Sequence, residues 1–226
     1  MFDFTDLISF LKNPEIGKQF EIKTFYSFLK LVLITFLILF FIDVIIGLGI
    51  STPMRYFKLI PSQKEVVYSP FNIFKISFLL PIIEELIFRL PLKISKTTIA
   101  IPLSIILFLF LYKLNLYIAI SLPIILFVFL FLRIKEGSDF IKKAVIFFTK
   151  YFFILFYFQA LIFGFLHLTN YRLDFNFFYL FPFFIVSYVL TGCLFGYIRV
   201  RYTFGIYVCI VSHIVINSTY CFVLSH

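Results

Sequence analysis

The sequence predicts an all-α protein that crosses a membrane about seven times, within a range of roughly six to eight helices. Of its 226 residues, 62% are hydrophobic and only 14% are charged, which leaves too little polar surface for a soluble domain of this size. The apolar residues also form long runs without a polar face, as expected for helices that contact lipid. At about 20 residues per crossing, the length suits one transmembrane domain.

Residues 1–26 are expected to form an amphipathic segment in the membrane interface, ahead of a single transmembrane domain over residues 27–226. Their apolar residues recur at helical spacing among charges: Phe4, Leu7, Ile8 and Leu11. Asn13, which is followed by a proline, is expected to end this short helix. Because the segment has mixed charge and no apolar core, it does not resemble a cleavable signal peptide.

Apolar runs along the rest of the chain give seven expected spans. They cover residues 28–50, 72–92, 98–112, 115–132, 144–168, 177–198 and 203–224. The first span is expected to stop at Gly47, Gly49 and Pro53. Residues 98–132 contain a single charge, Lys113, and are too long for one crossing. Two short spans are therefore expected there as an inserted hairpin, with a re-entrant hairpin as the alternative.

The net charge of +9 does not indicate nucleic-acid binding. Lysine and arginine lie in small groups between the apolar runs, where they influence membrane topology, and they form no basic stripe. Three cysteines, Cys193, Cys209 and Cys221, lie in apolar segments without a CxxC pair. We therefore expect buried thiols and no disulfide.

Four sets of polar residues interrupt the apolar runs, at depths where a charge costs about 3–10 kcal/mol. They are Asp43; Glu84, Glu85 and Arg89; His167; and His213 with Asn217. Polar groups at such depths need a partner or a function. Asp43 has no partner in the sequence pattern, which favours a structural role or a place along a substrate path.

The segment EELIFR, residues 84–89, predicts that its two glutamates differ. Glu85 and Arg89 are i,i+4 neighbours with the acid on the N-terminal side, the favourable order for an ion pair. Glu84 points about 100° away around the helix, so its carboxylate remains available for proton transfer with water. Pro81, one turn earlier, is expected to bend the helix. The alternative is a structural ion pair with a second acid that faces a polar cavity.

Two later spans contain histidine. His213 and Asn217 stack on one helix face at i,i+4 spacing, about 6 Å apart along the axis, where both can donate to the oxyanion formed when water attacks a peptide carbonyl. A pair of interhelical hydrogen bonds is the alternative. His167 lies at the end of its span, and Gly164 before it allows a backbone or a substrate to approach closely. Taken alone, such a histidine is more often structural or an interface anchor.

In order along the chain, these residues form the motifs EExxxR, FxxxH and HxxxN, each on its own membrane helix. This series resembles the CaaX protease and bacteriocin-processing (CPBP) family of intramembrane glutamic proteases, which is related to the Ras-converting CaaX endopeptidases. The resemblance covers about residues 72–224. Three motifs in the same order and the same membrane context make it specific.

The resemblance implies a role for each motif residue. By this resemblance, the catalytic residues are Glu84, His167, His213 and Asn217, and the supporting residues are Glu85 and Arg89. Glu84 is expected to activate the attacking water, which His167 shares. His213 and Asn217 are expected to form the oxyanion hole.

The expected function is an intramembrane endopeptidase that hydrolyses a peptide or protein substrate near the lipid bilayer, in the plasma (inner) membrane of a bacterium. No cofactor is favoured because the chain lacks the HExxH zinc motif; Zn²⁺ held by Glu84, His167 and His213 is the alternative. Two other classes remain. One is a non-catalytic binding or immunity protein of the same fold, and the other is a transporter, for which the polar residues are few and paired repeats are missing.

One feature departs from the family pattern. Residues 90–162 separate the first two motifs, which is longer than expected for the family, and they include the inserted hairpin. Two added crossings preserve the direction of the later helices. With the spans given above, Glu84 lies in mid-span and His167 lies near a membrane face. A water shared by both requires the second helix to start later or the fifth to continue past His167.

Overall fold

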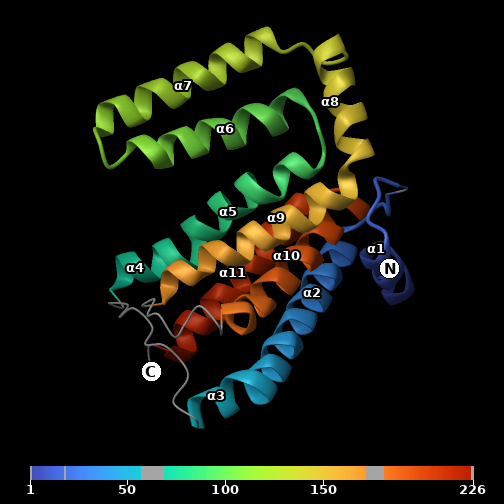
Figure 1. The fold of residues 1–226 in the computed structure, drawn as a ribbon, viewed down its shortest axis with the longest axis vertical. Helices are drawn as coiled ribbons and strands as arrows, with labels where there is room; N and C mark the ends of the chain where they lie inside the picture. Colours follow the sequence, from blue (N-terminus) through green and yellow to red (C-terminus); the bar gives the residue numbers. More distant parts are fainter. Residues whose placement is uncertain (1, 18, 57–68, 172–180, 225–226) are drawn as a thin grey trace.

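The computed structural model describes residues 2–17, 19–56, 69–171 and 181–224, and these are mostly helical (Figure 1). Five helical segments in these residues are long and apolar enough to cross a membrane. Two are extended by short turns: α2 (Phe25–Ile46), whose segment continues to Met54, and α9 (Phe152–His167), whose segment continues to Asn170. The others are α7 (Leu116–Arg133), α10 (Phe181–Arg201) and α11 (Gly205–Leu224). The predicted all-α, polytopic membrane fold is confirmed. The three cysteines are buried and free, as expected.

The other two predicted spans also contain helices. The second is composed of α4 (Pro70–Phe74), a π-helical turn η2 (Lys75–Leu79), α5 (Leu80–Phe88) and a 3₁₀ turn η3 (Leu90–Leu92). The third contains α6 (Lys96–Leu111), an apolar helix of 16 residues. In Figure 1, α6 and α7 form the expected hairpin, and α6 packs against α5. Ser95 and Asn115 cap the two hairpin helices by accepting hydrogen bonds from backbone N–H groups.

The first predicted span ends too early. Instead of stopping near Ile50, α2 continues through a π-helical turn η1 (Gly47–Ser51) into α3 (Thr52–Tyr56). Gly47 keeps a right-handed helical backbone, with φ −58° and ψ −49°. Pro53 directly follows Thr52, whose N–H donates to the Gly47 carbonyl in the π-helical register, so its missing N–H falls where the wide turn ends. Glycine and proline are therefore accommodated here within a continuous helical segment.

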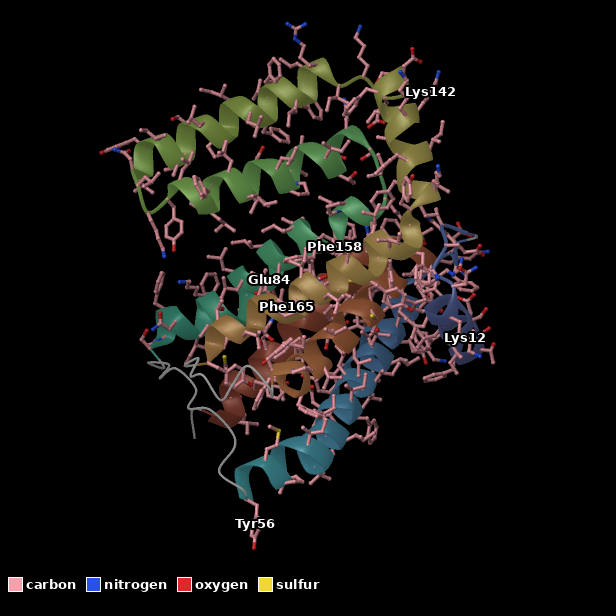
Figure 2. The ribbon with its side chains drawn as sticks, in the orientation of Figure 1. Lys12, Tyr56, Glu84, Lys142, Phe158 and Phe165 are labelled. Atoms are coloured by element: carbon pink, nitrogen blue, oxygen red, sulfur yellow. The ribbon has the colours of Figure 1, made fainter. Side chains whose placement is uncertain are left out.

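The fifth predicted span is wrong at its start. Residues 144–150 belong to α8 (Asp139–Lys150), a separate helix that turns away from α9 at Tyr151 (Figure 1). Figure 2 shows Lys142 at the outer edge of α8. The three lysines of α8 share one face, whereas Ile141 is buried on another. Such an amphipathic helix is stable along a membrane surface rather than across it, which explains the break.

The N-terminal helix α1 (Phe4–Lys12) uses two faces. Leu7 and Phe10 are buried against the rest of the protein. Phe4 and Ile8 remain exposed, with 57% and 54% of their surface accessible. Only this second face is available for the membrane interface that the sequence predicts, because the first belongs to the protein core.

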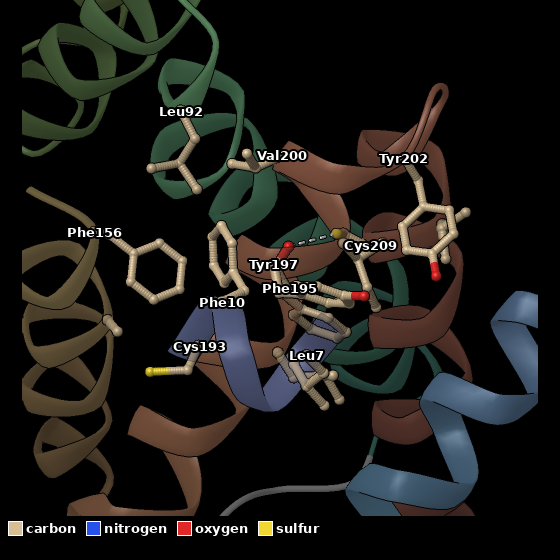
Figure 3. Packing of buried hydrophobic residues seen from close by; sticks show 14 of the residues in the cluster. Leu7, Phe10, Leu92, Phe156, Cys193, Phe195, Tyr197, Val200, Tyr202 and Cys209 are labelled. Atoms are coloured by element: carbon tan, nitrogen blue, oxygen red, sulfur yellow. Dashed lines mark hydrogen bonds between the residues drawn. The ribbon is translucent and has the colours of Figure 1, made fainter. Parts of the chain in front are cut away.

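Several contacts attach the N-terminal segment to the end of α10. The ring of Phe10 packs edge-on against Tyr197, with centroids 5.3 Å apart (Figure 3). Arg201 Nε lies 3.3 Å from the carboxylate of Asp6. Further along, the Phe20 N–H donates to the Arg201 carbonyl at 2.6 Å. The segment thus closes one end of the helical bundle.

The helices α9 and α10 approach each other closely at small residues. A Cβ atom added to Gly192 would lie 3.1 Å from the Cα atom of Ala160. One added to Gly164 would lie 3.3 Å from the Ile185 carbonyl oxygen, so the close approach expected at Gly164 is made by a neighbouring backbone. Small residues permit this packing between membrane helices. It fixes α9, and with it His167, against α10.

Candidate active site

The helix that contains the two glutamates follows an irregular turn. The Leu80 N–H bonds to the Lys75 carbonyl in the π-helical register. Pro81 has no N–H and cannot extend this register to the next carbonyl, that of Ile76. Asn217 of α11 donates its side-chain amide to the Ile76 carbonyl instead, at 3.2 Å. A side chain from another helix therefore stabilises the irregular turn before α5.

Glu85 and Arg89 form the expected i,i+4 ion pair, with 3.4 Å between Oε2 and Nε, and both side chains are 0% exposed. The guanidinium lies over the ring of Phe163 at 3.9 Å, with Phe195 at 5.6 Å and Phe88 at 5.8 Å. Its nitrogens form no hydrogen bond with the described residues. Aromatic faces therefore surround the buried cation where hydrogen-bond acceptors are usual.

His213 of α11 lies between the two glutamates. Its Nδ1 is 2.8 Å from Glu85 Oε1, and because an ionised carboxylate only accepts, Nδ1 is the donor. Its Nε2 lies 3.6 Å from Glu84 Oε2. The sequence predicts an oxyanion site for this histidine but gives no indication of its contact with both carboxylates.

The two glutamates meet this histidine differently. Glu85 accepts from His213 Nδ1 and also pairs with Arg89, so its carboxylate is held from two sides. Glu84 approaches His213 Nε2 at 3.6 Å, slightly beyond hydrogen-bond distance. Glu84 is therefore the less constrained of the two carboxylates.

The two glutamates differ in accessibility as well as in partners. The side chain of Glu84 is 27% exposed, whereas that of Glu85 is fully buried. Figure 2 shows Glu84 on α5 in the region beside α9. Of the two carboxylates, only Glu84 can be reached by water or a substrate.

His167 is the last residue of α9, and two neighbours orient its ring. Its Nδ1 lies 2.8 Å from the Phe163 carbonyl, which can only accept, so Nδ1 bears the hydrogen. The ring stacks on Tyr188 of α10, with centroids 4.0 Å apart and an interplanar angle of 21°. In the neutral ring, Nε2 is consequently the nitrogen that can accept a hydrogen bond.

The predicted spans put Glu84 and His167 at different depths, but the helix geometry brings both toward the same end of the bundle. Phe88 of α5 packs against Phe163 of α9 at 5.6 Å, and the two helices run in opposite directions (Figure 1). From this contact, Glu84 is one turn back along α5 and His167 is one turn forward along α9. Both displacements lead toward the same end of the bundle. In addition, the fifth helix continues past His167 as a 3₁₀ turn η4 (Leu168–Asn170).

Three aromatic residues contribute contacts that the sequence analysis did not assign. Phe163, the first residue of the FxxxH motif, contacts Arg89 and both site histidines. Its i,i+4 spacing from His167 is the one indication available in the sequence. Phe195 and Tyr188 lie on α10, and nothing distinguishes them among 37 phenylalanines and 14 tyrosines.

Asp43 has a partner that the sequence pattern did not reveal. The Tyr220 hydroxyl of α11 donates a hydrogen bond to the Asp43 carboxylate. Tyr220 lies seven residues after His213 on the same helix face as Asn217, about 10 Å along the axis from the glutamate cluster. The bond joins α2 to α11, which favours the structural role of the two expected for Asp43.

Among the described residues, no three His, Cys, Asp or Glu side chains are arranged to hold a metal ion. The expected alternative zinc ligands, Glu84, His167 and His213, belong to one region but do not form such a group. Comparisons with protein-family models, with curated proteins and with solved structures found no match for this chain.

Proposed function

We propose that this chain is an intramembrane endopeptidase of the CPBP type, in which Glu84 activates the water that hydrolyses a peptide bond. The observation that supports it most is the asymmetry of the paired glutamates. Glu85 is fully buried between Arg89 and His213, whereas Glu84 is accessible and faces His213 Nε2. The motif series over residues 72–224 supports the same family, and with it a location in the bacterial plasma membrane.

In the proposed mechanism, Glu84 acts as the base and His213 acts as a donor. Glu84 removes a proton from water as the water oxygen attacks the substrate carbonyl carbon. The His213 Nε2–H and the second amide N–H of Asn217 stabilise the resulting oxyanion, while His167 Nε2 accepts the other hydrogen of the water. Glu84 then gives its proton to the leaving nitrogen as the C–N bond breaks, which yields a carboxylic acid and an amine.

Proteolysis of a peptide library in proteoliposomes, with products identified by mass spectrometry, tests this proposal. Glu84→Gln preserves the size of the side chain but removes the base, so cleavage should slow by about 10²- to 10⁴-fold. His167→Ala should also slow cleavage. Glu21→Gln changes an exposed acid in the N-terminal segment and is the matched control, with an unchanged rate. Equal cleavage by wild type and Glu84→Gln would refute the proposal.

Chelation distinguishes this mechanism from a zinc mechanism. The mechanism proposed here uses no metal, because the chain lacks the two-histidine helical zinc motif. Treatment with EDTA or 1,10-phenanthroline should leave the cleavage rate unchanged. If chelation abolished cleavage and Zn²⁺ restored it, Glu84, His167 and His213 would be assigned as metal ligands and Glu84 would no longer be the base.

A further inference from the structure

The helix α8 has a different direction from the helices on either side of it in the chain. In Figure 1 it runs across one end of the bundle, at a wide angle to α7 before it and to α9 after it. Helices that cross a membrane lie roughly along the membrane normal. A helix that turns across the end of such a bundle therefore lies along the membrane surface.

Contacts with the bundle fix the rotation of α8 about its own axis. Ile141 is buried, and the ring of Phe148 packs against that of Phe152 in the first turn of α9, with centroids 5.7 Å apart. Ile141 and Phe148 are seven residues apart and therefore lie on the same face of the helix. The other side of α8 consequently points away from the protein.

The outward side contains a stripe of alternating phenylalanine and lysine: Phe140, Lys143, Phe147 and Lys150. Their spacing of three and four residues makes each a neighbour of the next along one side of the helix. All four are exposed, and each of the two phenylalanines has 58% of its surface accessible. Exposed aromatic rings on a surface helix are stable when they insert at the boundary between lipid headgroups and acyl chains.

The two lysines of the stripe have no acidic partner among the described residues. The Nζ atom of Lys150 lies only beside the ring of Tyr151, 5.1 Å from its centroid. Lys142 differs from both, because its Nζ lies 3.8 Å from Asp139 Oδ1 and because it points about 100° away from Lys143 around the helix. The ammonium groups of Lys143 and Lys150 are therefore available to an anionic ligand.

The pairing of a ring with each ammonium group favours an anionic phospholipid as this ligand. A free phosphate would pair with the lysines but would leave the rings in water. A zwitterionic lipid would accept the rings, but its own cation compensates its phosphate. Residues 133–150 contain five cations and two acids, and such basic segments are favoured on the cytoplasmic side, where the leaflet is anionic.

We propose that α8 binds anionic phospholipids, with Lys143 and Lys150 at the headgroups and Phe140 and Phe147 among the acyl chains. The bilayer surface is then the partner of this helix. Because Phe148 connects α8 to α9, the bound lipid holds the start of α9 at the membrane boundary. The inference does not depend on the proposed protease function, since it uses neither Glu84 nor a substrate.

Tryptophan fluorescence tests the proposal, because the chain has no tryptophan and Phe147→Trp supplies a single reporter within the stripe. The protein is reconstituted in bilayers of phosphatidylcholine and phosphatidylglycerol, where either the phosphatidylglycerol or the same mole fraction of phosphatidylcholine has brominated acyl chains. Bromine quenches only the tryptophan that it contacts, and the two bilayers have the same charge. Brominated phosphatidylglycerol should quench about threefold more strongly than brominated phosphatidylcholine. This preference should disappear at high KCl concentration.

Variants in the Phe147→Trp background test the stripe itself. Lys143→Gln combined with Lys150→Gln should make the two brominated lipids quench equally. Lys142→Gln is the matched control, because it removes the same charge from the same helix but from a lysine that is paired with Asp139, and it should retain most of the preference. A reporter placed instead on α7 by Ile125→Trp, at a position that is 60% exposed, should be quenched equally by both lipids.

Three results would overturn the proposal. The first is equal quenching of the reporter at position 147 by the two lipids. The second is an equal loss of preference in Lys142→Gln and in the double lysine variant, because total charge and not the stripe would then select the lipid. The third is quenching by aqueous acrylamide but by neither brominated lipid, which would place the outward side of α8 in water, where an acidic protein could bind it.

Discussion

The helix α10 and the α6–α7 hairpin are stabilised in different ways. Half of the α10 span is buried inside the protein, against 11% of the α7 span, so most of α7 is exposed on the outside of the bundle. The helix α10 packs closely on α9 and also contacts α2 and α11, whereas the hairpin meets the bundle mainly where α6 lies on α5. The identity of a residue in α10 is thus constrained by its neighbours. In α7, hydrophobicity is the main requirement.

This difference also separates the charged cluster from the hairpin. Glu84, Glu85 and His213 lie on α5 and α11, and Arg89 directly follows α5. The helices α9 and α10 supply the aromatic residues around the cluster. Changes in the bundle should therefore disturb the cluster and the stability of the protein more than changes in the hairpin.

Removal of an arginine should give the largest difference in stability between the bundle and the hairpin. Arg89→Met leaves Glu85 buried without its cation, and breaking a buried ion pair in this way costs about 3–5 kcal/mol. Arg133→Met, at the exposed end of α7, should change stability by less than about 0.5 kcal/mol. Unfolding by SDS titration in mixed micelles measures both.

The double variant Arg89→Met with Glu85→Gln identifies the cause of the loss. Once the acid is neutral, the missing cation should matter less, so the double variant should be more stable than Arg89→Met alone. A double variant as unstable as the sum of the single changes would show that the loss comes from packing around Phe163 instead of from charge.

Glycine should also behave in opposite ways in the two environments. Gly192→Ala places a Cβ atom 3.1 Å from the backbone of Ala160 and should destabilise the protein by about 1–3 kcal/mol. Gly47→Ala adds a methyl group where nothing lies within 4 Å, in a helical conformation, and should stabilise it by up to about 1 kcal/mol. The same SDS titration gives both values. Destabilisation by both would mean that crowding between α9 and α10 is not the cause.

The fold was largely predictable because hydrophobicity and length determine membrane spans. The hairpin helices begin and end within two residues of the predicted 98–112 and 115–132. The break at Tyr151 was missed because no glycine or proline marks it. It results from the lysines of α8, which favour the membrane surface. The continuation of α2 through Gly47 was missed because glycine ends a helix only when the backbone leaves the helical region.

The site was predictable only within single helices. The i,i+4 spacing was sufficient to pair Glu85 with Arg89, because helix geometry alone brings them together. The place of His213 between the glutamates depends on how α5 and α11 are rotated relative to each other, which no local pattern specifies. The contact between Asn217 and Ile76 has the same origin.

A smaller effect is expected at the irregular turn before α5. Asn217→Ala removes the donor to the Ile76 carbonyl and should cost about 1–2 kcal/mol. Pro81→Ala supplies a backbone N–H in the same turn, so Asn217→Ala should cost about 1 kcal/mol less in that background. SDS titration of wild type, Asn217→Ala, Pro81→Ala and the double variant measures the difference. Strict additivity would show that the bond does not compensate for the proline.

Cleavage rates of the same four proteins separate the two roles of Asn217. If Asn217 also donates to the oxyanion, its loss should lower the rate in both backgrounds, even where stability has recovered. Recovery of the rate together with stability would limit Asn217 to a structural role.

The smallest effect is expected at the junction between the bundle and the hairpin. Lys93 lies between α5 and α6, and its Nζ donates to the Tyr202 carbonyl at 3.2 Å. Burial, followed by the positive charge of Arg199, lowers the pKa of Lys93 from 10.5 to about 8. The folded state therefore disfavours the protonated form. This penalty is fully present below pH 8, declines as the pH rises from about 8 to 10.5, and is absent above that.

The thermal midpoint of unfolding should consequently gain about 1–3 °C from this group between pH 8 and 10.5. Lys93→Met has no charge at any pH, so its midpoint should lack this rise, and the difference from wild type should change with pH. Lys23→Met removes an exposed lysine, so its thermal midpoint should change with pH as that of wild type does. If the midpoint of Lys93→Met changed with pH as that of wild type does, Lys93 would be as accessible to solvent as the surface of the hairpin. A difference between the two midpoints that changes with pH would show that Lys93 is buried, like the charges of the bundle.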